Sequence, residues 1–493
     1  MSTPDSEVTA TTAPVGDRSF LGQPRSLATI FGVEMWERFS FYGMQGILLL
    51  YLYYSAAQGG LGIPQTTAAG IVGAYGGGVY LCTILGAWLA DRLLGSERTL
   101  FYSAVLIMLG HISLALLPGV AGVAVGLVLI AVGSGGVKAN ATSVVGTLYA
   151  PDDPRRDAGF SLFYLGINLG AFIGPILTGL LQTSLGFHWG FGLAAVGMAF
   201  GLIQYSIGRR RLGPAASVVP NPLPRNRWAR FAAIAVVALA VIAVLVALGV
   251  ITADNLVGIV IVATVIAAVA YFVIILSSKL ISADERSRVF AFVPLFVASV
   301  AFWSLYQQQF TVVTLYADSR LNRSLFGWEM PVSWVQSINP VFIILLSGIF
   351  AALWTRLGTR QPSTPVKFAL GTAGMGLAFL GFLPFTATTA DGSTPLLALV
   401  GILFLFTIAE LLLSPVGLSV TTKLAPAAFR TQMVALFFLS IALGTAISGV
   451  LAELYVTLPE AAYFGILGGL AILVGAILLV VTPWVRRLMR GVR

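Results

Sequence analysis

Long apolar runs, separated by short polar segments, cover nearly all of the chain after residue 27. Residues 231–250 contain no charge, and about 20 apolar residues let a helix cross the hydrocarbon core of a bilayer. Lipid offers the backbone no hydrogen-bond partners, so such spans fold as helices. The pattern predicts fourteen spanning helices, at 28–55, 68–93, 98–117, 120–147, 159–182, 187–208, 228–250, 256–278, 290–316, 332–356, 366–386, 393–422, 428–457 and 459–483.

The composition agrees with an all-α, polytopic membrane protein. Of the 493 residues, 58% are hydrophobic and 10% are charged, and the mean hydropathy is +0.93, which is outside the usage of soluble domains. The single cysteine, Cys82, excludes a disulfide framework and a cysteine-based metal site. The polar segment 1–23 lacks the basic start and apolar core of a cleaved signal. We therefore expect it to be a disordered cytoplasmic tail.

Positive charges are distributed unevenly between the two sides of the predicted helices. With the N-terminus inside, only Arg320 and Arg323 of the 28 Lys and Arg residues fall outside, and Arg38 and Lys138 lie within helices. All the others fall in cytoplasmic segments. This is the expected side, because positive residues keep short loops in the cytoplasm. We therefore expect a multi-pass protein of the plasma (inner) membrane with both termini cytoplasmic. This asymmetry and anionic lipid head groups account for the net charge of +9, so no nucleic-acid partner is expected.

A basic, proline-rich segment at 208–227 separates the first six predicted helices from the rest, a composition typical of a linker. The next two helices have no ionisable residue in their cores, as expected of helices that face lipid. Six more helices follow. This layout favours two six-helix bundles that rock around a central site, at 24–208 and 286–493, with a linker and two inserted helices at 209–285.

Five charges lie well inside the predicted helices, where each costs at least about 2.5 kcal/mol on insertion scales. They are Glu34, Glu37, Arg38, Lys138 and Glu410. In the segment VEMWERFSFYG, the first three share one helix face with Phe41 and Gln45. One interpretation is a cluster that snorkels to the cytoplasmic interface. Three charges with aromatic residues on one face exceed what snorkelling needs, and they favour a face that lines a cavity.

The other two charges have distinctive surroundings. Lys138 follows a glycine-rich stretch, 133–136, that permits close helix approach, and Glu410 precedes Pro415, which permits a kink. A structural ion pair is the alternative interpretation for each charge. Together the three acids and two bases leave one negative charge in excess, which one proton or one cation would neutralise. This excess is a physical basis for coupling to a proton gradient.

Several motifs resemble those of the proton-dependent oligopeptide transporter family, a branch of the major facilitator superfamily. Residues 33–43 are similar to the family's ExxERFxYYG signature, and GAWLADRLLGSER (86–98) is similar to the superfamily motif between the second and third helices. Motifs of the fourth, fifth, eighth and tenth helices of the family resemble GSGGVKAN, FYLGINLGAFIGP, SINP and AELLLSPVG, at 133–140, 163–175, 337–340 and 409–417.

The resemblance implies the major facilitator fold and a proton-coupled symporter that imports di- and tripeptides by alternating access. It implies no enzymatic activity and no cofactor, with protons as the coupling ion, and we expect a monomer in the lipid bilayer. Lys138 is expected to approach Glu410, which would face the ammonium group of the substrate. The resemblance assigns proton coupling to Glu34, Glu37, Arg38, Lys138 and Glu410, and substrate binding to Tyr42, Gln45, Tyr80, Lys138, Asn168, Gln307, Asn339, Glu410, Ser414 and Phe437.

Four positions depart from the family pattern. The family often has tyrosine where this chain has Phe41, and tryptophan where it has Phe437. It often has a basic residue at the position of Gln45, and an acid at that of Gln307. If these two glutamines face each other, a charged pair has become an amide pair and no charge is stranded.

Two other function classes are alternatives. A proton-coupled carrier of another small solute such as nitrate remains open, because plant relatives in the family include nitrate transporters. A membrane-embedded hydrolase needs a nucleophile with a base, or metal ligands. The two histidines, His111 and His188, lie on or beside separate spans without a nearby acidic ligand. A channel does not fit the layout of two bundles.

Overall fold

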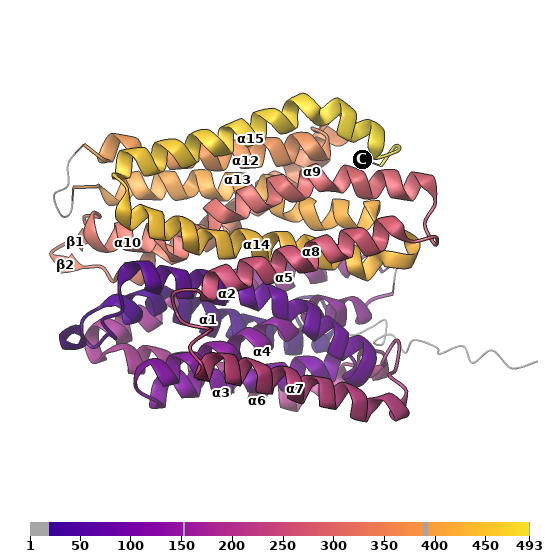
Figure 1. Cartoon of the computed structure of the whole chain (residues 1–493), viewed down its shortest axis with the longest axis horizontal. Coiled ribbons are helices and arrows are strands. Elements are labelled where there is room, and N and C mark those ends of the chain that lie inside the picture. The colour runs from indigo at the N-terminus through magenta and orange to yellow at the C-terminus, as the bar shows by residue number, and fades with distance from the viewer. Residues whose placement is uncertain (1–18, 151–152, 388–392, 493) are drawn as a thin grey trace, which may run out of the picture.

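The computed structural model describes residues 19–150, 153–387 and 393–492, which are almost entirely helical (Figure 1). Of the tail predicted at 1–23, residues 1–18 lie outside the described residues. Residues 19–23 form a turn in which the backbones of Phe20 and Gln23 exchange two hydrogen bonds.

The N-terminal half is coloured indigo to magenta in Figure 1, and its long helices are α1 to α6. Its elements are α1 (Arg25–Tyr53), η1 (Ala56–Gln58), α2 (Gln65–Leu89), η2 (Ala90–Leu94), α3 (Ser96–Leu116), α4 (Gly119–Thr147), α5 (Arg156–Leu185) and α6 (Phe187–Gly208). The segment after α6 contains three short turns, η3 (Arg209–Arg211), η4 (Pro214–Ser217) and η5 (Arg225–Arg227), and leads to α7 (Trp228–Ala247) and α8 (Leu256–Ser277).

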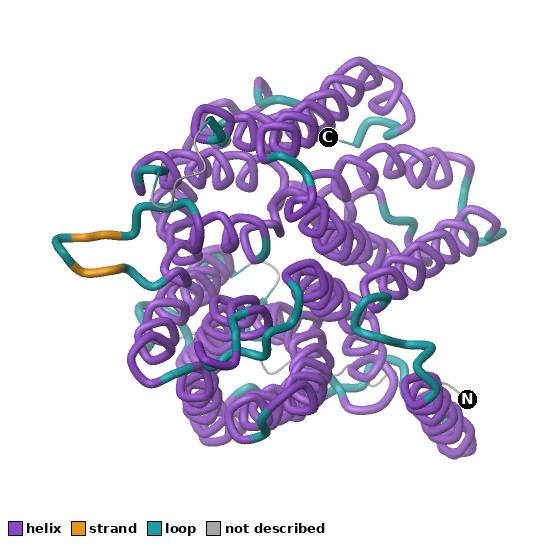
Figure 2. Tube along the Cα trace, turned by 60° about the vertical axis from the view of Figure 1, so that its left-hand side comes forward, coloured by secondary structure: helices purple, strands orange, loops and turns teal. Residues whose placement is uncertain are grey.

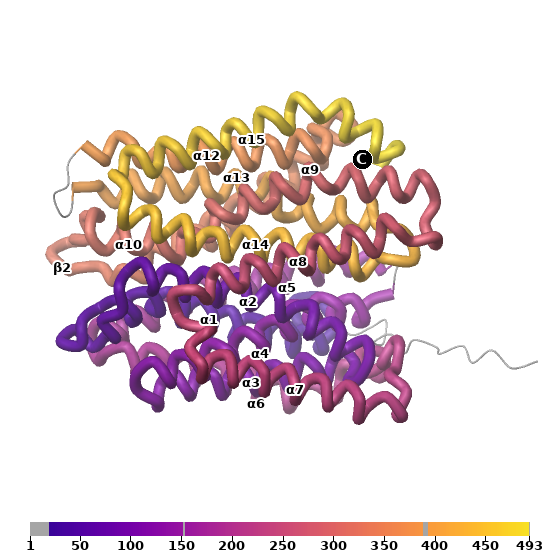
Figure 3. Tube along the Cα trace, viewed as in Figure 1, coloured from indigo at the N-terminus to yellow at the C-terminus, as the bar shows by residue number. Residues whose placement is uncertain are grey.

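The C-terminal half, rose to yellow in Figure 3, lies alongside the first half. Its elements are α9 (Ala283–Tyr306), η6 (Gln307–Phe310), α10 (Val312–Ser319), β1 (Ser324–Leu325), β2 (Trp328–Glu329), η7 (Val332–Ser337), α11 (Ile338–Leu357), η8 (Gly358–Arg360), α12 (Thr364–Leu380), η9 (Leu383–Phe385), α13 (Leu396–Leu424), η10 (Ala427–Phe429), α14 (Arg430–Thr457) and α15 (Glu460–Leu488). The two short strands pair as an antiparallel hairpin that projects from one end of the helices (Figure 2).

The predicted all-α membrane fold is confirmed. Within the described ranges, 13 helices are long and apolar enough to span a membrane, and α1, with 29 residues, is the fourteenth long span. Its buried charges explain why α1 is not among the 13. The span predicted at 290–316 is not one continuous helix, because η6 and the non-helical backbone of Thr311, with φ −124° and ψ −86°, separate α9 from α10.

Small residues let α1 lie directly against α5. A Cβ atom added at Gly170 would lie 2.1 Å from the backbone oxygen of Met35, and one at Gly174 would lie 2.4 Å from that of Phe39. Only glycine permits so close an approach of two backbones. This packing fixes the position of α1, which carries three of the buried charges.

The inserted helices differ in their packing. None of the residues of α7 is buried, and α7 lies at the outer edge of the N-terminal half (Figure 1), as expected of a helix that faces lipid. In contrast, α8 packs against α2 and α14 and so covers the line where the two halves meet. The division into domains at 24–208, 209–285 and 286–493 stays a prediction.

Candidate substrate cavity

A cavity of about 790 Å³ lies between the two halves, within the size range of pockets that hold small molecules, about 300–1,000 Å³. Its walls come from α1, α2, α4 and α5 on one side, and from α9, η6, η7, α11, α13 and α14 on the other. Most of the predicted site residues line it: Glu34, Arg38, Tyr42, Tyr80, Lys138, Asn168, Asn339, Glu410, Ser414 and Phe437. Glu37 lies behind this wall, fully buried.

The cavity extends toward the end of the molecule where α5 begins and where α11 and α13 end. Ser161, Ala351 and Leu418, which lie near these helix ends, all contribute to its lining. The cavity therefore approaches the surface at this end.

Contacts between the halves close the opposite end. The hydroxyl of Ser333 in η7 donates a hydrogen bond of 2.9 Å to the backbone oxygen of Pro175 in α5. The hydroxyl groups of Tyr53, the last residue of α1, and of the following Tyr54 both donate to the carboxylate of Asp318 in α10, Tyr54 over 2.7 Å. These bonds hold α1 and α5 against the C-terminal half, so the cavity is open at one end only.

The charged residues of α1 form a compact buried cluster. Arg38 donates from Nη2 and Nε to Oε1 of Glu34, over 2.7 and 2.9 Å. Arg38 Nε also lies 3.2 Å from Oε2 of Glu37, but its single proton points to Glu34, so this contact is an ion pair without a hydrogen bond. Glu37 accepts a hydrogen bond of 2.9 Å from Ser134 in α4. One cation thus serves two carboxylates, which leaves the cluster one negative charge in excess.

Lys138 contacts aromatic rings instead of a carboxylate. Its Nζ lies 4.9 Å from the ring centre of Phe41 and 5.5 Å from that of Tyr80, within the range of cation–π attraction. Among the described residues, no carboxylate oxygen lies within 4.0 Å of this ammonium group. The ion pair with Glu410 that the resemblance implies is therefore not formed in this conformation, and the lysine faces the cavity as an unpaired cation.

Glu410 is held by one of its two oxygens. Its Oε2 accepts hydrogen bonds from the hydroxyl of Tyr306, over 2.8 Å, and from Nδ2 of Asn339, over 3.2 Å. Asn339 Nδ2 also donates to Thr407 over 3.0 Å, which fixes the amide. Within the described chain, Oε1 of Glu410 has no hydrogen-bond partner, and Glu410 lines the cavity. That oxygen is available to a cationic ligand.

Sequence reasoning missed several residues of the cavity wall. Tyr306, Trp303, Gln309 and Gln336 line it, and the polar run YQQQ at 306–309 is the sequence signal that marks two of these positions, Tyr306 and Gln309. Asn168 donates to the backbone oxygen of its own helix at Tyr164, over 2.9 Å, so its amide oxygen remains for a ligand.

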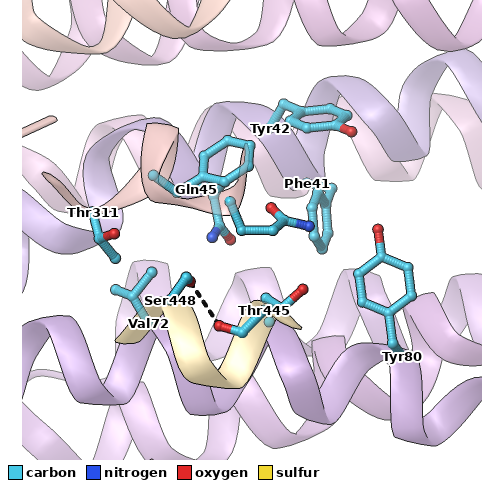
Figure 4. A pocket seen from close by; sticks show the side chains of 11 residues that line it. Phe41, Tyr42, Gln45, Val72, Tyr80, Thr311, Thr445 and Ser448 are labelled. Carbon is cyan, nitrogen blue, oxygen red and sulfur yellow. Dashed lines mark hydrogen bonds between the residues drawn. The ribbon is translucent and has the colours of Figure 1, made fainter. Parts of the chain in front are cut away.

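Gln45 and Gln307 do not line the large cavity. Both line a smaller pocket of about 30 Å³ between α1, α2, η6 and α14 (Figure 4). Tyr42, Tyr80 and Phe310 line both spaces, so the small pocket borders the large cavity. The shared pocket supports the hypothesis that the two glutamines face each other.

Two helical halves around one central cavity that is closed at one end define a membrane transporter of the major facilitator type. Comparison with known proteins agrees, because the model of the POT family matches residues 97–467. The chain belongs to this family, and the prediction made from its motifs is confirmed. The family and the relatives below are transporters and not enzymes, so the hydrolase alternative is set aside.

Individual relatives match over nearly their whole length. The chain is 45% identical to the uncharacterized transporter YclF of Bacillus subtilis (strain 168) over 482 residues, 97% of each chain. It is 41% identical to a di-/tripeptide transporter of Lactococcus lactis subsp. cremoris over 490 residues, 97% of this chain and 99% of the relative. A crystal structure of the peptide transporter POT in complex with sulfate is 45% identical, with a TM-score of 0.93, over 99% of this chain and 100% of that one.

Proposed function

We propose that this protein is a symporter that uses a proton gradient to import di- and tripeptides by alternating access. The family match and the relatives named di-/tripeptide transporters support this function. The observation that carries the proposal is the charge arrangement of the large cavity. An unpaired ammonium group, Lys138, and a carboxylate with one free oxygen, Glu410, line the same space.

This arrangement suits a zwitterionic peptide. Lys138 takes the carboxylate of the substrate, and Oε1 of Glu410 takes its ammonium group, because charge-assisted hydrogen bonds are the strong ones. Asn168 and Asn339 offer amide groups to the peptide bond. Tyr42, Tyr80, Ser414 and Phe437 complete the proposed site.

The cluster of Glu34, Glu37 and Arg38 is the proposed proton site. Its excess negative charge lies in a low-dielectric interior, where one proton removes the imbalance. The unpaired Lys138 lies beside it, so a substrate carboxylate at Lys138 adds negative charge near the same cluster. Proton and peptide binding are thereby linked, with protons as the coupling ion and no cofactor.

The described conformation is open toward the cytoplasm in this proposal. The open end lies near Arg156, Arg356 and Lys423, at the helix ends where the sequence concentrates positive charge. Both termini lie on that side of the plasma (inner) membrane, in a protein that functions as a monomer in the bilayer. Opening the other end requires breaking the bonds of Ser333 and Asp318 to the N-terminal half.

The test is uptake of labelled dialanine into proteoliposomes that contain the purified protein. Dialanine is expected to accumulate above its outside concentration with an inward proton gradient, and only to equilibrate when a protonophore collapses that gradient. Proton-driven accumulation of nitrate, with no uptake of dialanine, would favour the other carrier hypothesis.

The two glutamines of the small pocket give a further prediction. Gln45→Arg or Gln307→Glu alone buries an uncompensated charge, which costs roughly 3–5 kcal/mol, so each single variant is expected to lose most uptake or expression. The double variant is expected to recover uptake beyond the sum of the single effects, because contacting residues couple non-additively. The measurement is uptake per molecule of inserted protein for the wild type, the two single variants and the double variant. Additive losses would show that the two side chains do not meet.

A further inference from the structure

The small pocket in Figure 4 contains buried polar atoms that lack partners. Gln45 is 5% exposed, and its Oε1 has no hydrogen-bond partner among the described residues. Thr311 is 1% exposed, and its Oγ1 also has no hydrogen-bond partner among them. A buried polar atom without a partner costs about 1–3 kcal/mol. Two such atoms in one enclosed space indicate that the pocket binds something that supplies the missing hydrogen bonds.

The remaining polar groups of the pocket are also uncharged. Ser448 and Thr445 of α14 lie across the pocket from Gln45 (Figure 4). Their hydroxyls donate to backbone oxygens of their own helix, each over 2.7 Å, so their oxygens remain as acceptors. The amide of Gln307 adds both a donor and an acceptor. Among the described residues, no charged side chain lines this pocket, so a charged ligand group would be stranded there without a partner.

The volume limits the ligand to a small group. A space of about 30 Å³ holds more than the single water molecule that about 10–15 Å³ accommodates. A methyl group would fit but would leave Gln45 and Thr311 unsatisfied. A hydroxyl or carboxamide group can both donate and accept, and therefore matches this lining.

We propose that this pocket is a neutral subsite that binds the hydroxyl or carboxamide group of a substrate side chain. The proposal rests on peptide transport as the function, because the side chain enters from a peptide in the adjoining cavity. Tyr42, Tyr80 and Phe310 belong to both linings, so the two spaces adjoin. The subsite selects peptides with serine, threonine or asparagine side chains.

The test compares two dipeptides that differ in one group. L-alanyl-L-serine and L-alanyl-L-2-aminobutyrate, in which a methyl replaces the hydroxyl, compete with labelled dialanine for uptake into proteoliposomes. The serine peptide is expected to inhibit about tenfold more strongly, the ratio that about 1.4 kcal/mol produces. An apolar pocket would reverse the order, because it favours the methyl group.

Two substitutions remove the unpartnered atoms with little change of shape, Thr311→Val and Gln45→Met. Each substitution is expected to bring the ratio of the inhibition constants of the two peptides close to one. The ratio is independent of the absolute rate of each variant. Thr421→Val is the matched control, because Thr421 is fully buried in α13, donates its hydroxyl to the backbone oxygen of Gly417 in its own helix and lines neither space. It is expected to keep the wild-type ratio.

The possible outcomes separate this proposal from the proposed function. If dialanine accumulates but the wild-type ratio is near one, the pocket holds water only and the subsite is refuted, while peptide transport stands. A ratio that stays at tenfold in both variants would also refute the subsite, because the selectivity would then come from another part of the cavity. Absence of any dialanine uptake by the folded wild-type protein would contradict the function itself.

Discussion

Glu37→Gln is expected to abolish the accumulation of dialanine driven by protons, while exchange of labelled for unlabelled dialanine continues. Glu37 is fully buried beside Arg38 and Ser134. Glutamine keeps the size of the side chain but removes the charge that a proton would neutralise. A gradient of one pH unit supports about tenfold accumulation for each coupled proton, equivalent to about 1.4 kcal/mol. The variant is expected to reach only the outside concentration.

The matched control for this variant is Glu97→Gln. Glu97 is also buried and forms an ion pair of 2.6 Å with Arg209, but it lies in α3, outside the lining of the large cavity. It is expected to retain concentrative uptake. Tenfold accumulation by Glu37→Gln would remove Glu37 from the proposed coupling site.

Lys138→Gln is expected to remove recognition of the peptide carboxylate. Loss of one charge-assisted hydrogen bond costs about 2 kcal/mol, so the apparent affinity for dialanine is expected to fall about 30-fold. Dialanine amide, which lacks the carboxylate, separates this role from a structural one. Wild-type protein is expected to prefer dialanine over the amide, and the variant is expected to lose that preference. Both the apparent affinity and this preference are measured by competition with labelled dialanine in the exchange assay.

Lys367→Gln is the control for the loss of a buried lysine. Lys367 is also buried, and its Nζ lies 4.0 Å from the ring centre of Trp354, so it resembles Lys138 in its aromatic surroundings. It does not line the large cavity. Its substitution is expected to leave the preference for the free carboxylate intact. If Lys138→Gln also keeps that preference, another group binds the carboxylate.

The sequence predicted the spanning helices well, because the length of an apolar run is a direct consequence of bilayer thickness. The break at Thr311 was not predictable in this way. Residues 290–316 are mostly apolar, with glutamines at 307–309 and four scattered serines and threonines, and no glycine or proline marks the point where α9 ends. The packing of η6 in the interior, and not local propensity, determines this break.

The site was predictable only in part, for a similar reason. The charges of α1 are identifiable because burying them is costly, and the structure places Glu34 and Arg38 at the cavity. Tyr306 was missed because a tyrosine in an apolar helix is usually a packing residue. The absence of an ion pair between Lys138 and Glu410 depends on the separation of the two halves, which changes with conformation and which no local pattern encodes.

The most direct test of coupling is the internal pH of proteoliposomes when dialanine is added outside without an imposed pH gradient. Dialanine entering down its own gradient is expected to carry protons with it, so a trapped pH-sensitive dye should report acidification. Glu37→Gln should abolish this signal. Entry of dialanine into wild-type vesicles without any acidification would show that peptide and protons do not move together, and would refute proton-coupled transport.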